Sequence, residues 1–255
     1  MKSIQTIRKT EANILLIGSH SPIIQSMLDF DFLTGREKPS VKVIIAGGRK
    51  FERYFFGKKQ VMIPVFDQLK SIPGDIARDL TFFFNTTSAR RAKQSTIEAL
   101  SFFPQILGGT IFAENIPEQH SLELYHFAQA YKKFIIGPAS VGILVPGKVK
   151  IGAIGGTDYR QLAASDVVTS GNVAVFSASG GMTNEIIQIV AQQGRRLSFA
   201  LSFGGDRFPV LTPREAMLAA QEDTQTEVIV YYGELGGTDE YDIVELLESK
   251  KLKKQ

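Results

Sequence analysis

The sequence predicts an α/β protein with parallel sheets in two domains, and three observations support this. Short apolar runs typical of strands alternate with helical patterns through most of the 255 residues, as βαβ units require. Several of these runs end in glycine-rich turns, where open sheets bind ligands. The segment 137–171 is rich in glycine, contains Pro138 and Pro146, and interrupts the alternation. We expect a first domain at residues 1–136, a linker or crossover at 137–171 and a second domain at 172–255.

In the first half, the expected elements follow one another at short intervals. Strands are expected at 13–18, 41–46, 61–66 (with a turn at Pro64), 80–84, 110–113 and 134–136. Helices are expected at 22–30, 89–101 and 118–133, and a further helix begins at 67–71. In the second half, strands are expected at 173–176, 197–203 and 227–232, and helices at 183–193, 213–221 and 240–250. Doubly wound domains have about five strands, so the second domain is expected to be incomplete: a fragment, a split subunit or a domain that a partner completes.

Composition excludes several classes of protein. With 44% hydrophobic and 22% charged residues, the chain is an ordinary globular protein. It has no cysteine, which excludes disulfides and cysteine nucleophiles, and its three histidines predict no metal site. A net charge of +3 is compatible with a small anionic ligand, whereas nucleic acid would need a denser basic stripe. The start resembles no secretory signal and no apolar run could span a membrane, so we expect a cytoplasmic location.

Two stretches in the second half carry the strongest functional signal. Ser177-Ala178-Ser179-Gly180-Gly181 follows a strand and precedes a helix, so it offers hydroxyls and helix N-terminal amides to an anion. The alternative is a tight turn with a serine cap. Gly233-Glu234-Leu235-Gly236-Gly237 places one carboxylate at the end of the last strand, which could equally be a solvated acid. Gly204-Gly205-Asp206 is a third such strand end, which favours a site.

The first half has no dinucleotide fingerprint. Gly18-Ser19-His20-Ser21 follows the first strand, but it is not G-x-G-x-x-G, and no acid ends the second strand to bind a ribose. Gly47-Gly48-Arg49-Lys50 stands there instead, which favours a phosphorylated nucleotide over NAD, while an ordinary surface lysine is the alternative for Lys50. His20 is interpreted as a polar loop residue or a ligand contact, and His120 and His126 as structural residues of one helix.

Several segments resemble the CoA-binding and CoA-ligase region of ATP-citrate lyase and, more distantly, the succinyl-CoA synthetase alpha subunit. They occur in the family's order over nearly the whole chain: Gln25-Ser26-Met27-Leu28-Asp29-Phe30-Asp31-Phe32, Ile63-Pro64-Val65-Phe66, Gly137-Pro138-Ala139-Ser140-Val141-Gly142, Pro146-Gly147, Lys150-Ile151-Gly152, Ser179-Gly180-Gly181-Met182, Gly204-Gly205-Asp206-Arg207 and Gly233-Glu234-Leu235-Gly236-Gly237-Thr238. The resemblance implies a Rossmann-like CoA-binding domain followed by an incomplete flavodoxin-like CoA-ligase domain.

The resemblance also implies a chemistry and its residues. In this family ATP phosphorylates a histidine, the phosphate passes to a carboxylate substrate, and CoA displaces it as a thioester. Ser177, Ser179, Gly180 and Gly181 match the segment that holds the phosphate, and Glu234 matches the glutamate that contacts the histidine. The residues that fall where the family binds CoA are Gly18, Ser19, Ser21, Lys50, Asn85, Thr86, Ser88 and Glu114. ATP and Mg are expected on an absent domain or a partner subunit.

The chain also departs from the family. No histidine here stands in the family's His-Ala-Gly-Ala motif, Ala178 and Pro22 replace arginines, and Asn115 replaces a glycine. We therefore expect a part of an ATP-citrate lyase or citryl-CoA synthetase that is not catalytically complete alone. It would work in a hetero- or homo-oligomer with an ATP-grasp subunit or domain and a phosphohistidine-bearing segment. The alternative is a non-catalytic CoA-binding or regulatory subunit, and an NAD-dependent oxidoreductase is disfavoured.

Overall fold

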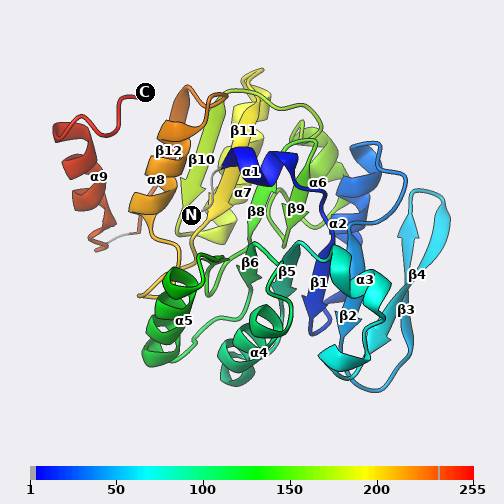
Figure 1. The fold of residues 1–255 in the computed structure, drawn as a ribbon. Coiled ribbons are helices and arrows are strands. Elements are labelled where there is room, and N and C mark those ends of the chain that lie inside the picture. The colour runs from blue at the N-terminus through cyan, green and yellow to red at the C-terminus, as the bar shows by residue number, and fades with distance from the viewer. Residues whose placement is uncertain (1–3, 235) are drawn as a thin grey trace.

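A computed structural model describes residues 4–234 and 236–255 as two sheets with flanking helices (Figure 1). The first seven strands are β1 (Ile14–Ile17), β2 (Val41–Ile45), β3 (Phe51–Phe56), β4 (Lys59–Phe66), β5 (Phe82–Asn85), β6 (Gly108–Ile111) and β7 (Phe134–Ile136). The next five are β8 (Ile143–Val145), β9 (Val149–Ile151), β10 (Val173–Ser177), β11 (Leu197–Ser202) and β12 (Val228–Tyr232). The α/β prediction is confirmed.

The helices lie between and around these strands. They are α1 (Ile4–Lys9), α2 (Ser21–Leu33), α3 (Gly74–Asp79), α4 (Ala89–Phe102), α5 (Glu118–Ala130), α6 (Tyr159–Ala164), α7 (Gly180–Gln192), α8 (Pro213–Glu222) and α9 (Asp239–Glu248), with a short 3-10 helix, η1, at Leu69–Ser71. Among the described residues, no helix is both long and apolar enough to cross a membrane.

The first sheet has the order β3-β4-β2-β1-β5-β6-β7. Every neighbouring pair is parallel except β3 and β4, which form an antiparallel hairpin at the edge. Without β3, this is the Rossmann order, in which the direction of winding reverses between β1 and β5. The turn expected at Pro64 is wrong, because β4 runs straight through this residue. Pro64 pairs with β3 only, before the pairing with β2 begins at Val65, so its missing N–H costs no bond to β2.

The second sheet has five strands in the order β12-β10-β11-β8-β9. Three of them, β10, β11 and β12, are parallel and match the expected strands, while β8 and β9 add an antiparallel pair. Both added strands come from the segment 137–171, which we expected to be a linker. They were missed because each has only three residues between glycine- and proline-rich turns.

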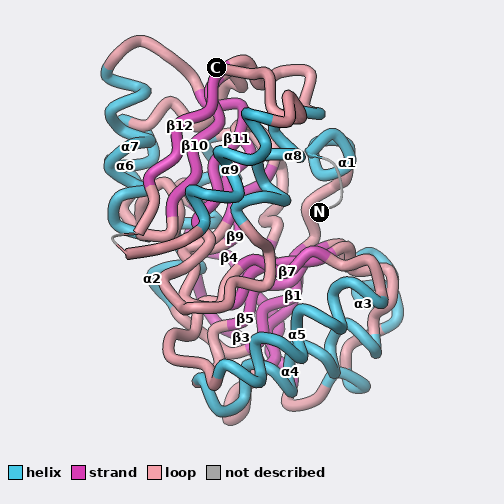
Figure 2. The backbone as a smooth tube through the Cα atoms, turned by 90° about the vertical axis from the view of Figure 1, so that its left-hand side faces the viewer, coloured by secondary structure: helices cyan, strands magenta, loops and turns pink. Residues whose placement is uncertain are grey.

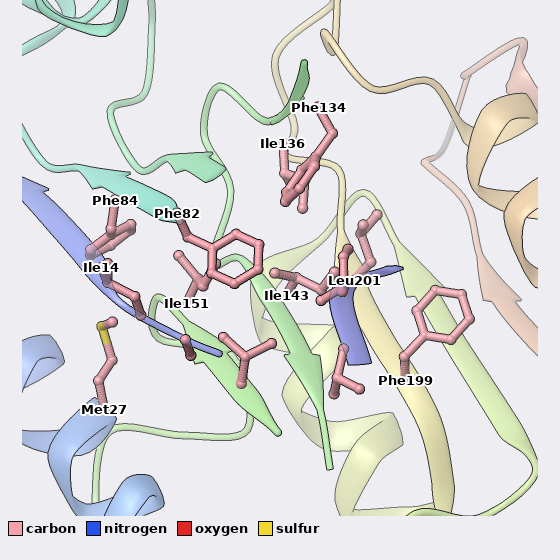
Figure 3. Close-up of a cluster of buried hydrophobic side chains, with 14 of the residues drawn as sticks. Ile14, Met27, Phe82, Phe84, Phe134, Ile136, Ile143, Ile151, Phe199 and Leu201 are labelled. Atoms are coloured by element: carbon pink, nitrogen blue, oxygen red, sulfur yellow. The ribbon is translucent and has the colours of Figure 1, made fainter. Parts of the chain in front are cut away.

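One hydrophobic cluster joins the two sheets (Figure 3). Phe82, Phe84 and Phe134 of the first sheet and Phe199 and Leu201 of the second all belong to it and are buried. Helix α1 also crosses between the halves: Ile7 lies in this cluster, and the Arg8 guanidinium pairs with the buried carboxylate of Asp223 at the end of α8. The two halves therefore pack as one body, and the carboxyl edges of their sheets are held in place against each other.

Candidate functional site

The carboxyl ends of parallel strands from both sheets surround one cavity of about 490 Å³. From the first sheet, Glu114 and Asn115 follow β6. From the second, Ser179 and Gly180 follow β10, Asp206 follows β11 and Glu234 follows β12. Figure 2 shows the two sheets one above the other. In the second sheet the chain reverses its direction of winding at β10, next to β12. The cavity therefore lies at the point where an open α/β sheet binds its ligand.

The start of α7 forms one wall of the cavity. Ser179 is the N-cap: its hydroxyl accepts a hydrogen bond from the Met182 amide at 3.3 Å. The amides of Gly180 and Gly181 occupy the first two helical positions, which have no acceptor within a helix. Gly180 is required here, because a Cβ atom would lie 2.6 Å from the Val141 side chain. This wall combines free amides with the positive end of the helix dipole, the combination that binds anions.

The four predicted phosphate-binding residues occupy different places. Ser179 and Gly180 line the cavity. Ser177 is fully buried, and its hydroxyl accepts a hydrogen bond from the Ser179 amide at 3.0 Å, so its side chain supports the turn from below. Gly181 is exposed, one residue further along α7, and is not among the lining residues.

Glu234, the predicted catalytic residue, lines the cavity from the end of β12 and is exposed. Its backbone carbonyl accepts a hydrogen bond from the Gly237 amide at 2.9 Å, which closes a tight turn. Leu235 lies outside the described residues. The side chain of Glu234 makes no hydrogen bond or ion pair with a described residue that would hold it in one orientation.

Carboxylates dominate the charge of this cavity. Glu114, Asp206 and Glu234 line it, and no lysine or arginine is among its described lining residues. Ala178, which also lines it, is the residue that stands where the family resemblance implies an arginine. A phosphate entering here would meet helix amides on one side and three carboxylates on the others. The cavity therefore combines anion-binding amides with a net negative charge from its side chains.

Asp206 ties the two edges together. Its carboxylate accepts hydrogen bonds from the amides of Asn115 and Ile116, both at 3.3 Å. Asn115 has a φ of 57°, in the left-handed region that favours glycine and that asparagine tolerates best among other residues. This conformation explains why asparagine can replace the family's glycine. The loop after β6 keeps its shape in spite of the substitution.

The other predicted CoA residues lie along the carboxyl edge of the first sheet, where the winding reverses between β1 and β5. Gly18 follows β1 with a φ of +87°, and a Cβ atom there would lie 2.7 Å from the Thr86 hydroxyl after β5. The two loops therefore touch, and only glycine fits between them. Ser21 is exposed at the start of α2, and Ser88 is exposed at the start of α4 with no side-chain capping bond. Lys50, after β2, is exposed and forms no ion pair with a described residue.

Asn85 does not face the ligand side of the edge. It is fully buried at the end of β5, and its amide nitrogen donates to the hydroxyls of Ser95 and Thr96 at 2.9 and 2.8 Å. Its oxygen accepts from the amide and the hydroxyl of Thr87 at 2.9 and 2.7 Å. Asn85 therefore fixes the loop 85–88 against α4, while the residues around it remain available to a ligand.

Glu52, a buried residue beside this edge, was not predicted as a site residue. The Ser19 hydroxyl donates to Oε2 of Glu52 at 2.9 Å, and the Tyr54 hydroxyl donates to the same oxygen. Burial and the bond to Glu52 raise the pKa of Tyr54 to about 12. Glu52 lies on β3, a strand that the sequence analysis missed. Its alternation of exposed and buried residues over Phe51–Phe56 is the signal that could have revealed it.

The histidines lie outside the cavity lining. The His20 ring packs edge-on against Phe112, with ring centroids 5.6 Å apart. In the described part of the chain, no three histidine or acidic side chains are grouped in a way that could hold a metal ion.

Known proteins match both halves of the chain. Residues 176–255 match the CoA-ligase family model. The chain is 35% identical, over its whole length, to a probable ATP-citrate synthase of Caenorhabditis elegans, of which it spans 23%. It is 38% identical, over 91% of its length, to ATP-citrate synthase beta chain protein 1 of Oryza sativa subsp. japonica, of which it spans 38%.

Solved structures agree with the sequence matches. A mutant ATP citrate lyase of Methanosaeta concilii in complex with (3S)-citryl-CoA has a TM-score of 0.89 and 30% identity, over 97% of this chain and 40% of that one. The acetyl-coenzyme A synthetase 1 of Ca. Korarchaeum cryptofilum, at 16% identity and a TM-score of 0.69, shares the fold alone. The chain thus spans 23% to 40% of the length of the ATP-citrate synthases and lyases described here. Over nearly all of its own length, it is similar to the CoA-binding and CoA-ligase region of ATP-citrate lyases, as the sequence motifs indicate.

Proposed function

We propose that this chain is the CoA-binding part of an ATP-citrate lyase or citryl-CoA synthetase type enzyme. The enzyme would form an acyl-CoA thioester from citrate, ATP and CoA through a phosphohistidine that another segment supplies. The single observation that carries this proposal is the convergence of the two carboxyl edges on one cavity. A ligand bound along the first edge can reach a phosphate held at the second without leaving the protein surface.

The first edge suits an extended nucleotide-containing ligand. Its predicted contacts lie at the ends of β2, β1, β5 and β6, which are adjacent in that order. Neighbouring strands are about 4.8 Å apart, so this row covers roughly 14 Å. The charged end at Lys50 suits the nucleotide phosphates of CoA, and the opposite end, at Glu114, opens into the cavity. The thiol of CoA would therefore arrive beside Ser179 and Glu234.

The second edge suits half of a phosphohistidine site. The Ser179 hydroxyl and the amides of Gly180 and Gly181 would donate to the phosphate, while Glu234 would accept a hydrogen bond from the imidazole and so orient it. The three carboxylates of the cavity disfavour free phosphate. They favour a phosphate that arrives with a cation or on a positively charged partner surface. ATP and Mg would be bound by a further domain or subunit.

One observation favours a second candidate, a non-catalytic CoA-binding or regulatory subunit. Ala178 removes the arginine of the family from the cavity, and none of the three histidines lies there. Such a subunit would bind CoA and a partner without taking part in phosphate transfer.

Calorimetric titration of the purified chain with CoA, dephospho-CoA and NAD tests the shared part of both candidates. Saturable binding that prefers CoA supports the first-edge site. Absence of CoA binding, in a chain shown by circular dichroism to be folded, contradicts both.

A reconstituted enzyme separates the two candidates. The chain is mixed with an ATP-grasp subunit and a histidine-bearing subunit of a relative, and thioester formation is measured. Turnover that Ser179→Ala reduces at least tenfold supports the catalytic proposal. CoA binding without turnover supports the regulatory one.

A further inference from the structure

The carboxylate of Glu52 has one oxygen that the protein itself leaves unsatisfied. The residue is 5% exposed. Its Oε2 accepts hydrogen bonds from the hydroxyls of Ser19 and Tyr54, whereas its Oε1 is buried and accepts none from a described residue. The Arg49 guanidinium lies 3.5 Å from Oε1 as an ion pair, without the geometry of a hydrogen bond.

A buried carboxylate oxygen without a donor is unfavourable, because it has lost its bonds to water and gained none. Oε2 already accepts two hydrogen bonds, one from Tyr54 on the same strand and one from Ser19, which ties the carboxylate to the loop after β1. Oε1 therefore remains the acceptor for a donor that comes from outside the chain. Arg49 covers it, but 57% of the Arg49 side chain is exposed, so this side chain can turn away.

The position of Glu52 indicates which chemical group would donate a hydrogen bond to Oε1. In doubly wound domains, an acid near the end of the second strand binds a ribose hydroxyl, and an arginine nearby accommodates a ribose phosphate. No acid ends β2 here. Glu52 comes from the next strand, β3, and its hydrogen bond to Ser19 places it beside the loop after β1. Arg49 lies beside it as an ion-pair partner, and Lys50 follows Arg49 in the chain.

We propose that Glu52 binds the ribose of CoA and so determines specificity for a ribonucleotide. Oε1 accepts a hydrogen bond from the free 2′-hydroxyl, and Arg49 turns from Glu52 to the neighbouring 3′-phosphate, which uncovers that oxygen. Glu52 also disfavours a phosphate on the 2′-oxygen. This inference rests on the proposed CoA site at the first edge and names the residue that selects its nucleoside end.

The test uses two competitors that carry the nucleotide end of CoA. Adenosine 3′,5′-bisphosphate and its 2′-deoxy analogue are titrated against CoA bound to the full chain. For the wild type, we expect the 2′-deoxy compound to bind about tenfold more weakly, the effect of one hydrogen bond to a charged group. The amide of Glu52→Gln can turn an N–H instead of an acceptor towards the ribose. In this variant we expect the ratio of the affinities for the two bisphosphates to fall below about threefold.

Two controls separate specificity from folding. Glu248→Gln, an exposed glutamate at the end of α9, should keep the wild-type preference. Tyr54→Phe removes one donor to Oε2 and leaves Oε1 unchanged, so it too should keep the preference even if its melting temperature falls.

The outcomes separate this inference from the proposed function. Equal binding of the two bisphosphates to the wild type, or no competition by either one, overturns the role of Glu52 while CoA binding itself stands. Failure of the folded wild type to bind CoA overturns the proposed function, and the role of Glu52 with it.

Discussion

The carboxyl edges of the two sheets both end in glycine-rich loops, but they are built differently. At the first edge, side chains fix the loops: Asn85 binds α4, and Glu52 binds the loop after β1. At the second edge, Glu234 is exposed and its side chain makes no such bond to a residue that the structure describes, and Ser179 caps its own helix. The first edge is therefore preorganised for a ligand by this chain alone. The second offers amides and carboxylates that, under the proposed function, a further segment would complete into a site.

Lys150 offers the largest expected effect, because it is buried where β9 of the second sheet packs against α2 of the first half. Its ammonium group is buried and donates to the Ser26 hydroxyl of α2 at 2.8 Å and to the Gly152 carbonyl at 2.7 Å. Desolvation lowers its pKa to about 7, although Asp29 and Asp31 oppose the shift. Between pH 7 and 10.5 the unfolded chain thus holds a proton that the folded protein has lost, so stability rises with pH across this window.

We expect the wild type to gain of the order of 3 kcal/mol of unfolding free energy from pH 7 to pH 10 relative to Lys150→Met, as measured by urea denaturation. Burial raises the pKa of Asp31 to about 6. The folded state therefore favours the protonated carboxyl, and this contribution to stability is lost as pH rises towards 6. The change is complete below the pH range of the Lys150 measurement. Lys148→Met, on the same hairpin but exposed, is the matched control. Parallel pH curves for the wild type and Lys150→Met would contradict the prediction.

Asn85→Ala should break the preorganisation of the first edge. It removes the partner of Thr87 and leaves the buried hydroxyl of Thr96 without its bond to Asn85. We expect a loss of about 2 kcal/mol in unfolding free energy and at least tenfold weaker CoA binding. Gln94→Ala, an exposed amide on α4, should change neither quantity appreciably. Unchanged CoA affinity in a destabilised Asn85→Ala protein would show that the loop 85–88 does not contribute to binding.

Asp206→Ala should loosen the connection between the two edges. The carboxylate is half-buried, so losing its two hydrogen bonds to the loop after β6 should cost about 1 kcal/mol. CoA binding should weaken only about threefold, because most of the proposed contacts lie elsewhere on the first edge. Asp67→Ala, an exposed aspartate after β4, serves as the reference. A loss of CoA binding as large as that of Asn85→Ala would mean that the cavity loops dominate affinity.

Ser179→Ala should have the smallest effect on the isolated chain. It removes a single capping hydrogen bond of 3.3 Å, so the melting temperature should fall by only a few degrees, for a loss of about 1 kcal/mol. CoA affinity should stay within twofold, because Ser179 belongs to the second edge. Thr212→Ala, at the N-cap of α8 and outside the cavity, should lower stability by a similar amount. A large loss of CoA affinity in Ser179→Ala alone would contradict the separation of the two edges.

The sequence predicts the parallel strands of both sheets because most of them are short, largely apolar runs that end in a turn. Runs such as Phe82–Asn85 and Val173–Ser177 are buried along their whole length. Strands β3, β8 and β9 escaped prediction for local reasons. β3 contains Glu52 and Arg53 and resembles a surface loop, while β8 and β9 have only three residues each. Their stability comes from pairing with distant strands, which no local pattern shows.

The site residues also divide into those that a local pattern reveals and those that depend on distant contacts. Glycines at strand ends, such as Gly18 and Gly180, mark close approach of the backbone, and motif and position are enough to find them. The direction of a side chain is not visible in a motif: Ser177 and Asn85 lie beneath the surface that they support. Glu52 and Asp206 act across long sequence distances, 33 and 91 residues from their partners Ser19 and Asn115. Only the fold brings these pairs together.

The central proposal, that the thiol end of CoA reaches the shared cavity, can be tested directly. The chain has no cysteine, so Ala178→Cys places a single thiol in the cavity lining. This variant is incubated with CoA disulfide, and the adduct is followed by mass spectrometry, with exposed Ser249→Cys as the control. We predict that Ala178→Cys reacts faster than the control, with a rate that saturates with CoA disulfide and falls when acetyl-CoA competes. Equal, non-saturating rates at the two positions would contradict it.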